Sequence, residues 1–465
     1  MIDLKALRQD PERFRRAASD KRMTVDVDAL LDLDRELREL MTRQQELTAE
    51  KNEIGKQIGQ LAGQVKKAEG DEKSRLEGEM KSLQARPAEI KTEEQTLADR
   101  IAELEPKRDA LWLEVPQPAD DDVPRGGSAD DNVELRRWNP DDFDPAVPFV
   151  DNRGFAPKTH LELCRDLRLV DFERGVKIAG ARSYVLTDDG MKLHQALMRL
   201  AFDFMVHDHG FTPLSAASLV RHDAMVGTGF FPHGRDQVYD VANPTGDYGL
   251  ALTGTGEVGL MAYHQDEILS ADELPKRYVT QSTCFRREAG AAGKDTAGLY
   301  RIHQFDKVEQ VVLCRADEAE TRAWHREMIG YVESLLQMLE LPYRLLQCCT
   351  GDLGPKNADQ VDIECWMPGR GERDRDDRPT GDYGETHSAS RLYDYQCRRL
   401  NIRYRDEETG KPVVAHSLNN TVAASPRLLI PILEMYQRED GTVKVPRVLQ
   451  PYMNGQEVIG EAAGG

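Results

Sequence analysis

The stretch that decides the fold of this chain reads CFRREAGAAGKDTAGLYRIHQFDKVE and spans residues 284–309. Its charged residues stand within runs of β-branched and aromatic residues, so residues 279–286 and 302–313 are predicted to be strands joined by a loop of small residues. The chain contains no G-x-x-x-x-G-K-[ST] phosphate loop, and a parallel-sheet nucleotide fold is not expected. The sequence predicts an α+β fold, with helices on the outside of an antiparallel sheet.

The arginines of this stretch indicate a ligand site. Arg286 and Arg301 offer guanidinium forks that match phosphate oxygens, and Arg427 supplies a third fork from a separate segment. Residues 289–293 are alanine and glycine, so the backbone can approach a ligand closely there. The pattern favours a polyphosphate held beside a small zwitterion. The alternative is a surface ion pair, which is the usual meaning of an isolated Arg-x-Glu triplet on a strand.

Residues 28–105 differ in kind from the rest of the chain. They lack aromatic residues and carry apolar residues in two heptad frames. Gly70 suits a helix end and Asp71 an N-cap between the two frames, while Pro87 should kink the second helix. We predict an antiparallel helical hairpin, an arm whose first helix would be about 50 Å long. A coiled coil for dimerisation is the alternative.

Composition sets further limits on the function. The chain has 465 residues, which predicts two or three domains, and a net charge of −20, which argues against a protein that coats nucleic acid. A local basic strip remains compatible with that charge. Seven cysteines without a C-x-x-C pair predict reduced thiols in the cytoplasm and neither zinc nor a disulfide framework. No apolar run is long enough to predict a membrane span.

Residues 284–309 closely resemble motif 2 of the seryl-tRNA synthetases, a family of class II aminoacyl-tRNA synthetases. The resemblance extends over nearly the whole chain. Strings similar to the family occur in the same order at residues 1–11, 131–138, 160–172, 190–211, 349–354 and 362–369.

This resemblance implies a domain organisation and a set of partners. Residues 1–115 would form a tRNA-binding domain with its arm at about 28–105, residues 116–150 a linker, and residues 151–465 the class II catalytic domain. The expected activity is serine–tRNA ligation with ATP and Mg²⁺. The expected partners are L-serine, tRNA(Ser), tRNA(Sec) and a second copy of the chain in a homodimer.

The resemblance also assigns roles to individual residues. Arg286 and Arg427 would be catalytic, and Glu385 and Ser388 would hold the magnesium ion of ATP. The residues expected to bind ATP are Arg286, Arg287, Glu288, Ile302, Glu385, Thr386, His387, Ser388 and Arg427. The residues expected to bind serine are Thr255, Gly256, Glu257, Arg286, Glu309, Asn419 and Thr421.

Several positions depart from the family pattern. In motif 1, at residues 211–220, alanines stand where the family carries paired prolines, and this motif builds the dimer interface. Gly256 replaces an alanine, and Thr421 replaces a serine but keeps the hydroxyl. Residues 371–380 form a charged insertion that is expected to be a mobile loop near the ATP site.

Two other functions are alternatives to the ligase. One is a synthetase-like ligase that loads an amino acid onto a carrier protein, although such relatives lack the long arm. The other is a coiled-coil scaffold with a decayed catalytic domain, which the retained charged residues disfavour. Histidine is not expected to act as a general base, because the carboxylate of serine is already a nucleophile.

Overall fold

The computed structural model describes residues 1–242, 246–290 and 297–460. The chain divides into two compact units, which are described separately. One comprises Asp3–Arg15 and Thr24–Val115, and the other Met1–Ile2, Arg16–Met23 and Pro116–Gly465. Within the described ranges, no helix is both long enough and apolar enough to cross a membrane.

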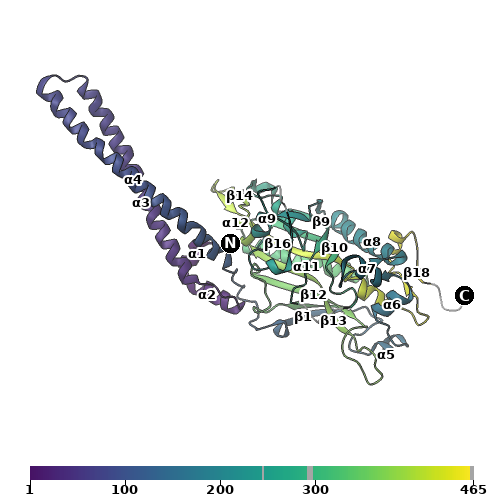
Figure 1. Cartoon of the computed structure of the whole chain (residues 1–465). Helices are drawn as coiled ribbons and strands as arrows, with labels where there is room; N and C mark the ends of the chain where they lie inside the picture. The colour runs from purple at the N-terminus through teal and green to yellow at the C-terminus, as the bar shows by residue number, and fades with distance from the viewer. Residues whose placement is uncertain (243–245, 291–296, 461–465) are drawn as a thin grey trace. The chain divides into compact units, whose positions relative to one another are not determined.

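The first unit is built around a helical hairpin, formed by α3 (Val27–Val65) and α4 (Gly70–Glu114) (Figure 1). Apolar side chains of the two heptad frames meet between the helices, and Leu47 and Ile90 are fully buried there. Lys51 reaches across to Glu94 at 2.6 Å. The predicted hairpin is confirmed, since the apolar seam of each helix is covered by the other helix of the same chain.

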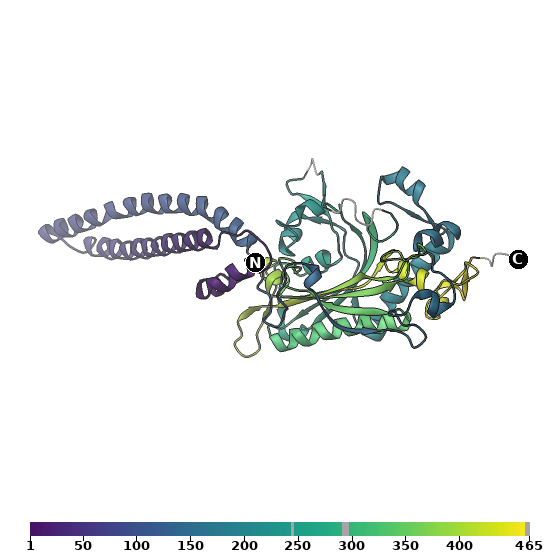
Figure 2. The same ribbon diagram turned by 90° about the horizontal axis from the view of Figure 1, so that it is seen from below.

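One local expectation for the hairpin needs correction, and the kink predicted at Pro87 stays a prediction. Gly70 has a φ of 63°, as expected for a helix end, but α4 already begins there with Glu69 as its N-cap, so Asp71 is not the cap. Pro87 and Pro106 lie inside α4, and the helix continues through both. Figure 2 shows α4 as a bowed helix. Each proline removes only one backbone hydrogen bond, and packing against α3 holds the rest of the helix together.

The second unit is organised by a large sheet. Within the described residues it has eight strands in the order β1-β11-β12-β13-β16-β10-β9-β4. Every neighbouring pair is antiparallel except β4 with β9. The strands are β1 (Val133–Trp138), β4 (Thr212–Pro213), β9 (Lys276–Phe285), β10 (Gln304–Cys314), β11 (Tyr343–Gln347), β12 (Asp359–Met367), β13 (Asp382–Tyr393) and β16 (His416–Ser425). This architecture confirms the predicted α+β class.

The two faces of the central strand β10 have different neighbours. Side chains alternate along a strand, so Val308, Gln310 and Val312 share one face and Lys307 and Glu309 share the other. Gln310 donates to a backbone carbonyl of α11 (Glu318–Met338), which Figure 2 shows along one side of the sheet. Helix α8 (Asp188–Asp203) belongs to the same apolar core. The opposite face is therefore left for charged side chains.

Shorter elements complete the chain. The other helices are α1 (Leu4–Gln9), α2 (Pro11–Asp20), α5 (Phe149–Arg153), α6 (His160–Asp166), α7 (Phe172–Ala179), α9 (His222–Gly227), α10 (Glu257–Ala262), α12 (Tyr395–Arg399) and α13 (Leu429–Met435). The other strands are β2 (Val170–Asp171), β3 (Val185–Leu186), β5 (Leu219–Arg221), β6 (Tyr239–Val241), β7 (Leu250–Leu252), β8 (Ile268–Ser270), β14 (Arg403–Arg405), β15 (Pro412–Val414), β17 (Val443–Lys444) and β18 (Val458–Ile459).

Lys21 connects an early segment of the chain with a late loop of the same unit. Its ammonium is buried and donates to the carbonyl oxygens of Gly354, at 2.9 Å, and Asn357, at 2.6 Å. Burial disfavours the charged form and lowers the pKa of Lys21 to about 7. These contacts hold the backbone on both sides of residues 355 and 356.

The lowered pKa of Lys21 predicts a pH-dependent stability. The ordinary lysine pKa of 10.5 applies to the unfolded chain, which therefore binds more protons than the folded chain between pH 7 and 10.5. The stability contributed by Lys21 is present above pH 10.5 and is lost as the pH falls towards 7. From pH 7 to 9, the free energy of unfolding of the wild type should rise by about 2 kcal/mol relative to Lys21→Met. Urea unfolding at both pH values measures this difference. The exposed Lys5→Met is the control, and an equal difference at both pH values would contradict the prediction.

Candidate active site

A cavity of about 340 Å³ lies on the charged face of the sheet. All the residues to which the resemblance assigned roles line it, except Arg287 and Gly256. They come from five segments: residues 255–257, 286–309, 385–388, 419–421 and 427. The cavity has two chemically different ends, one rich in arginine and aromatic side chains and the other in buried carboxylates and lysines.

Arg427 and Tyr300 form one wall of the arginine-rich end. The Arg427 guanidinium lies 4.4 Å from the centre of the Tyr300 ring, and its Nε donates to the Tyr300 carbonyl oxygen at 3.0 Å. Its Nη1 donates to the Glu385 carbonyl oxygen at 3.0 Å and lies 3.6 Å from the Glu385 carboxylate. These contacts hold a half-buried guanidinium at the cavity surface, where an anionic group could bind.

Arg286 and Glu288 also line this end. The Arg286 guanidinium stacks over the Phe305 ring at 5.3 Å. Glu288 has a φ of 53° and pairs with Arg301 at 2.8 Å. Arg301 therefore orients Glu288, which differs from the sequence expectation that Arg301 binds phosphate directly.

Thr386 and His387 line the cavity but form hydrogen bonds within the sheet. His387 Nε2 donates to the Val422 carbonyl oxygen at 3.1 Å, and its Nδ1 lies 2.8 Å from the Thr386 hydroxyl. Burial lowers the pKa of His387 to about 3, so the ring is neutral at physiological pH. This agrees with the expectation that histidine is not a general base here, and the expected contact of His387 with ATP stays a prediction.

Arg287 and Gly256 lie outside the cavity lining, contrary to expectation. Arg287 is adjacent to Arg286 and lines a separate surface hollow with Asp236 and Asp240. Gly256 precedes helix α10 rather than lying in a strand, and a Cβ there would come within 2.5 Å of Thr280 Cγ2. The glycine thus permits close packing and contributes no side chain to the site.

Residues 254–259 read GTGEVG, which is a G-x-G-x-x-G pattern. It lies between β7 and α10. However, β7 belongs to a small sheet in which its neighbours β5 and β6 are antiparallel to it. The pattern is therefore not part of a parallel dinucleotide-binding unit.

Glu309 lies at the bottom of the carboxylate-rich end. Its side chain is 2% exposed, and its Oε2 lies 2.6 Å from Lys307 Nζ and accepts from the Thr421 hydroxyl at 3.3 Å. Lys307 also donates to the Thr255 hydroxyl at 2.8 Å. Burial raises the pKa of Glu309, while the ammonium of Lys307 opposes that rise. The pocket thus offers a carboxylate and a hydroxyl, which together can recognise a ligand hydroxyl.

Glu257 is the second buried carboxylate. It accepts from Asn419 Nδ2 at 2.5 Å and from Gln396 Nε2 at 2.6 Å. The Lys356 ammonium contacts both of its oxygens, at 2.7 and 2.8 Å.

Sequence reasoning missed both lysines of the pocket. Lys307 could have been found, because it stands two residues from Glu309 on a strand and therefore shares its face. Lys356 lies in the loop between β11 and β12, and nothing in its local sequence connects it with Glu257.

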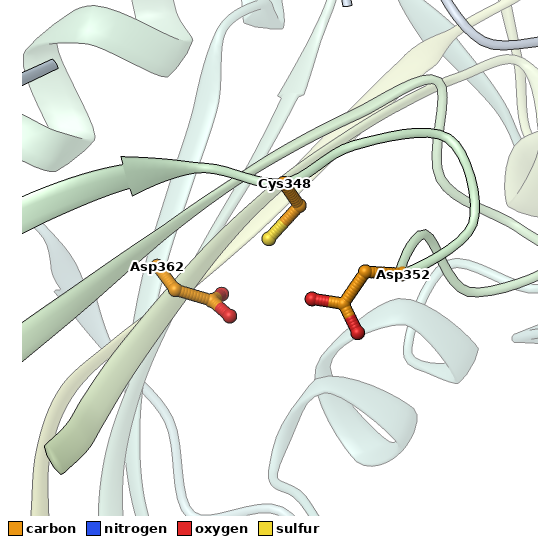
Figure 3. Close-up of side chains that lie close together, drawn as sticks. All are labelled: Cys348, Asp352 and Asp362. Carbon is orange, nitrogen blue, oxygen red and sulfur yellow. The ribbon is translucent and has the colours of Figure 1, made fainter. Parts of the chain in front are cut away.

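Cys348, Asp352 and Asp362 point towards one another (Figure 3). One ligand atom from each residue lies within 4.8 Å of the others. However, Asp352 accepts from Asn132 and Asp362 accepts from Gln360, and burial raises the pKa of the Cys348 thiol. Burial and the nearby Glu385 raise the pKa of Asp362 to about 7. These protein contacts account for the cluster, and it carries no metal assignment.

Two predicted loops have different outcomes. The small-residue loop 289–298 includes residues 291–296, which lie outside the described residues. The insertion at residues 371–380 is described and is bridged at its base by Arg373 and Pro379. Thr380 donates to the Glu372 carbonyl oxygen within it. The mobility of this insertion stays a prediction.

Comparison with known proteins defines the class first. Residues 239–436 match the tRNA synthetase class II core domain (G, H, P, S and T), and the antiparallel sheet with its cavity defines the second unit as a class II synthetase core. Residues 1–106 match the seryl-tRNA synthetase N-terminal domain.

Individual relatives specify the family. Serine–tRNA ligases from Deinococcus radiodurans and Thermobifida fusca are 41% and 40% identical to this chain, each over 99% of both chains. The crystal structure of seryl-tRNA synthetase from Pyrococcus horikoshii complexed with ATP is similar with a TM-score of 0.83, 35% identity and 99% coverage of both chains. The chain belongs to the seryl-tRNA synthetase family.

The contact between Lys307 and Glu309 predicts a coupled effect on stability. Lys307→Met should lower the free energy of unfolding by about 3 kcal/mol, because it leaves a buried carboxylate without its cation. Adding Glu309→Gln should recover part of that loss, since the uncompensated charge is removed. Urea unfolding of the wild type, both single variants and the double variant measures the coupling. Strictly additive losses would contradict it.

Proposed function

We propose that this chain is a serine–tRNA ligase. It activates L-serine with ATP to seryl-adenylate and then transfers the seryl group to the terminal ribose of tRNA(Ser). The single observation that carries the proposal is the cavity itself, which joins an arginine-rich end to a pocket with paired carboxylate and hydroxyl groups. Membership of the family supports the same activity.

The arginine-rich end suits ATP. Arg286 and Arg427 supply two of the positive charges that a triphosphate needs, and we propose them as the catalytic residues. Glu288 lines the same end and, with Ile302, fits an adenine edge. Arg287 is withdrawn from the ATP-binding set, because its side chain lines a different surface.

Glu385 and Ser388 are proposed to hold Mg²⁺ with the nucleotide. Both lie on β13 and line the cavity, and carboxylate and hydroxyl oxygens are donors that Mg²⁺ prefers. Glu385 is 46% exposed at its side chain, so it is accessible to an ion that arrives with ATP. The bound ion would neutralise phosphate charge. Thr386 and His387 lie between these ligands and support the strand.

The other end suits serine. We propose that Glu309 and Thr421 recognise the substrate hydroxyl, and that Thr255, Glu257 and Asn419 surround its amino group. Gly256 contributes by close packing alone. A site built to bond a hydroxyl rejects an analogue without it by roughly 10⁴–10⁵, because its own polar groups stay unpaired. Alanine is therefore excluded by hydrogen bonding.

The first reaction step needs no general base. The serine carboxylate attacks the α-phosphorus of ATP, the bond to the β-phosphate oxygen breaks, and pyrophosphate leaves. Arg286 and Arg427 place the phosphates and stabilise the charge that develops on them. His387 takes no proton in this step, since its ring is bonded within the sheet and stays neutral.

We further propose a functional division of the chain and its assembly. The arm at residues 28–105, within a domain of residues 1–115, binds tRNA(Ser) and tRNA(Sec). Residues 116–150 link it to the catalytic domain, residues 151–465. A homodimer is supported by a hollow lined by Leu214, Ala216 and Tyr263, with Leu219 exposed beside it. A cytoplasmic location stays a prediction.

The two alternative functions have less support. A carrier-protein ligase does not account for the arm, which matches the seryl-tRNA synthetase N-terminal domain. A decayed scaffold does not account for Glu309, Glu257 and Arg427 converging on one cavity.

Amino-acid-dependent exchange of pyrophosphate into ATP tests the activity. Exchange is expected with serine and not with alanine. Thr421→Val should raise the KM for serine by roughly tenfold while the KM for ATP stays the same, because one hydrogen bond at a buried site is lost. Thr96→Val, in the arm, is the matched control and should match the wild type. If no amino acid supports exchange of pyrophosphate into ATP, the proposed enzymatic activity is refuted.

The arm's role is tested by deletion. Removing residues 30–105 and joining the ends with a short glycine–serine linker should leave serine-dependent exchange intact, since the cavity lies wholly in the second unit. The same variant should not charge tRNA(Ser). Charging that survives the deletion would show that the arm is not needed to bind tRNA.

A further inference from the structure

The amino-acid end of the cavity contains an ammonium group of the protein's own. Lys356 Nζ lies 2.7 and 2.8 Å from the two oxygens of Glu257, and the side chain is 14% exposed. Glu257 is 4% exposed at its side chain. A buried carboxylate requires a compensating positive charge, and in this structure Lys356 supplies it.

The remaining contacts of Glu257 leave little room for a second cation. Its Oε1 already accepts from Asn419, Gln396 and Lys356. Its Oε2 accepts from Lys356. The ammonium of a bound amino acid would need this second oxygen, and two ammonium groups on one carboxylate repel each other.

The side chain of Lys356 can leave Glu257 without a movement of the loop backbone. Its backbone is held on both sides, because Lys21 binds the carbonyl oxygens of Gly354 and Asn357. The side chain is a flexible four-carbon stem, so it can move while the loop stays in place. Lys356 Nζ already lies over the Phe230 ring, 4.1 Å from its centre, while it contacts Glu257, so this cation–π contact can persist after the ammonium leaves the carboxylate.

We propose that Lys356 sets the affinity of the pocket for its amino acid by competing for Glu257. In the empty pocket its ammonium neutralises Glu257. When the substrate binds, the substrate's ammonium takes over that role, and Lys356 leaves Glu257 while it keeps its contact with the Phe230 ring. The inference rests on the proposed function, because it takes Glu257 as the acceptor of the substrate's amino group.

This exchange has a definite consequence for ligands. A ligand with an ammonium must displace Lys356 before it gains its contact with Glu257, so Lys356 raises the KM for serine. A ligand in which a hydroxyl replaces the ammonium cannot neutralise Glu257 and leaves Lys356 in place. Serine and glycerate differ in this way and share the carboxylate and the side-chain hydroxyl.

The test compares Lys356→Met with the wild type in serine-dependent pyrophosphate exchange. The variant should lower the KM for serine by roughly tenfold, the size expected for removing one competing charge contact at a partly desolvated site. The KM for ATP should not change. Inhibition by glycerate should weaken or stay the same, because the variant's Glu257 gains no cation from glycerate.

Two further variants test the same inference independently of Lys356→Met. Lys356→Gln keeps a neutral donor for Glu257 and should also lower the KM for serine, so it serves if Lys356→Met does not fold. Lys356→Arg keeps the charge and adds a second donor, and it should raise the KM. Thermal unfolding with and without serine gives a readout that does not depend on turnover, and serine should stabilise Lys356→Met more than the wild type.

The outcomes separate this inference from the proposed function. A wild-type protein without serine-dependent exchange would defeat the proposed function. Exchange in the wild type, combined with an unchanged or raised KM for serine in Lys356→Met and Lys356→Gln, would defeat the inference alone. In that case Lys356 would hold Glu257 in place for the substrate and not compete with it.

Discussion

The burial of two carboxylates on one face of the sheet is the constraint on which the rest of the site depends. Glu309 and Glu257 lie where water is largely excluded, and an isolated charge there would be costly. Each is neutralised by a lysine, Lys307 at 2.6 Å and Lys356 at 2.7 Å. The four charges sum to zero, so the empty pocket holds no uncompensated charge. Polar recognition of a small ligand becomes possible because the protein first satisfies its own buried charges.

The antiparallel register brings these groups together. Glu309 stands opposite Thr421 on one neighbouring strand and opposite Thr280 on the other. Since side chains alternate, the same strand sends Val308 and Gln310 into the core beneath α11. One strand therefore supplies both stability and recognition. At the arginine-rich end, the guanidinium groups of Arg427 and Arg286 are positioned by aromatic rings, and a backbone carbonyl oxygen also binds Arg427.

Much of the fold and the site could be predicted from local pattern. The heptads predicted the hairpin, and β-branched runs predicted the strands that became β9 and β10. The errors arose where a side chain's direction or a partner decided the outcome. Arg287 was grouped with Arg286, yet the two line different hollows. Arg301 was read as a phosphate ligand, yet it pairs with Glu288.

The sequence by itself determined the class of fold, the arm and the types of residue that meet the two ends of the ligand, because periodicity and residue chemistry are local properties. Only the tertiary structure decided which charges neutralise one another. Lys356 and Glu257 are 99 positions apart, and Asn419 is 162 positions from the same carboxylate. Such pairings depend on loops and strands that meet only when the sheet has formed. Electrostatic compensation is set by distance in space, which the order of residues does not reveal.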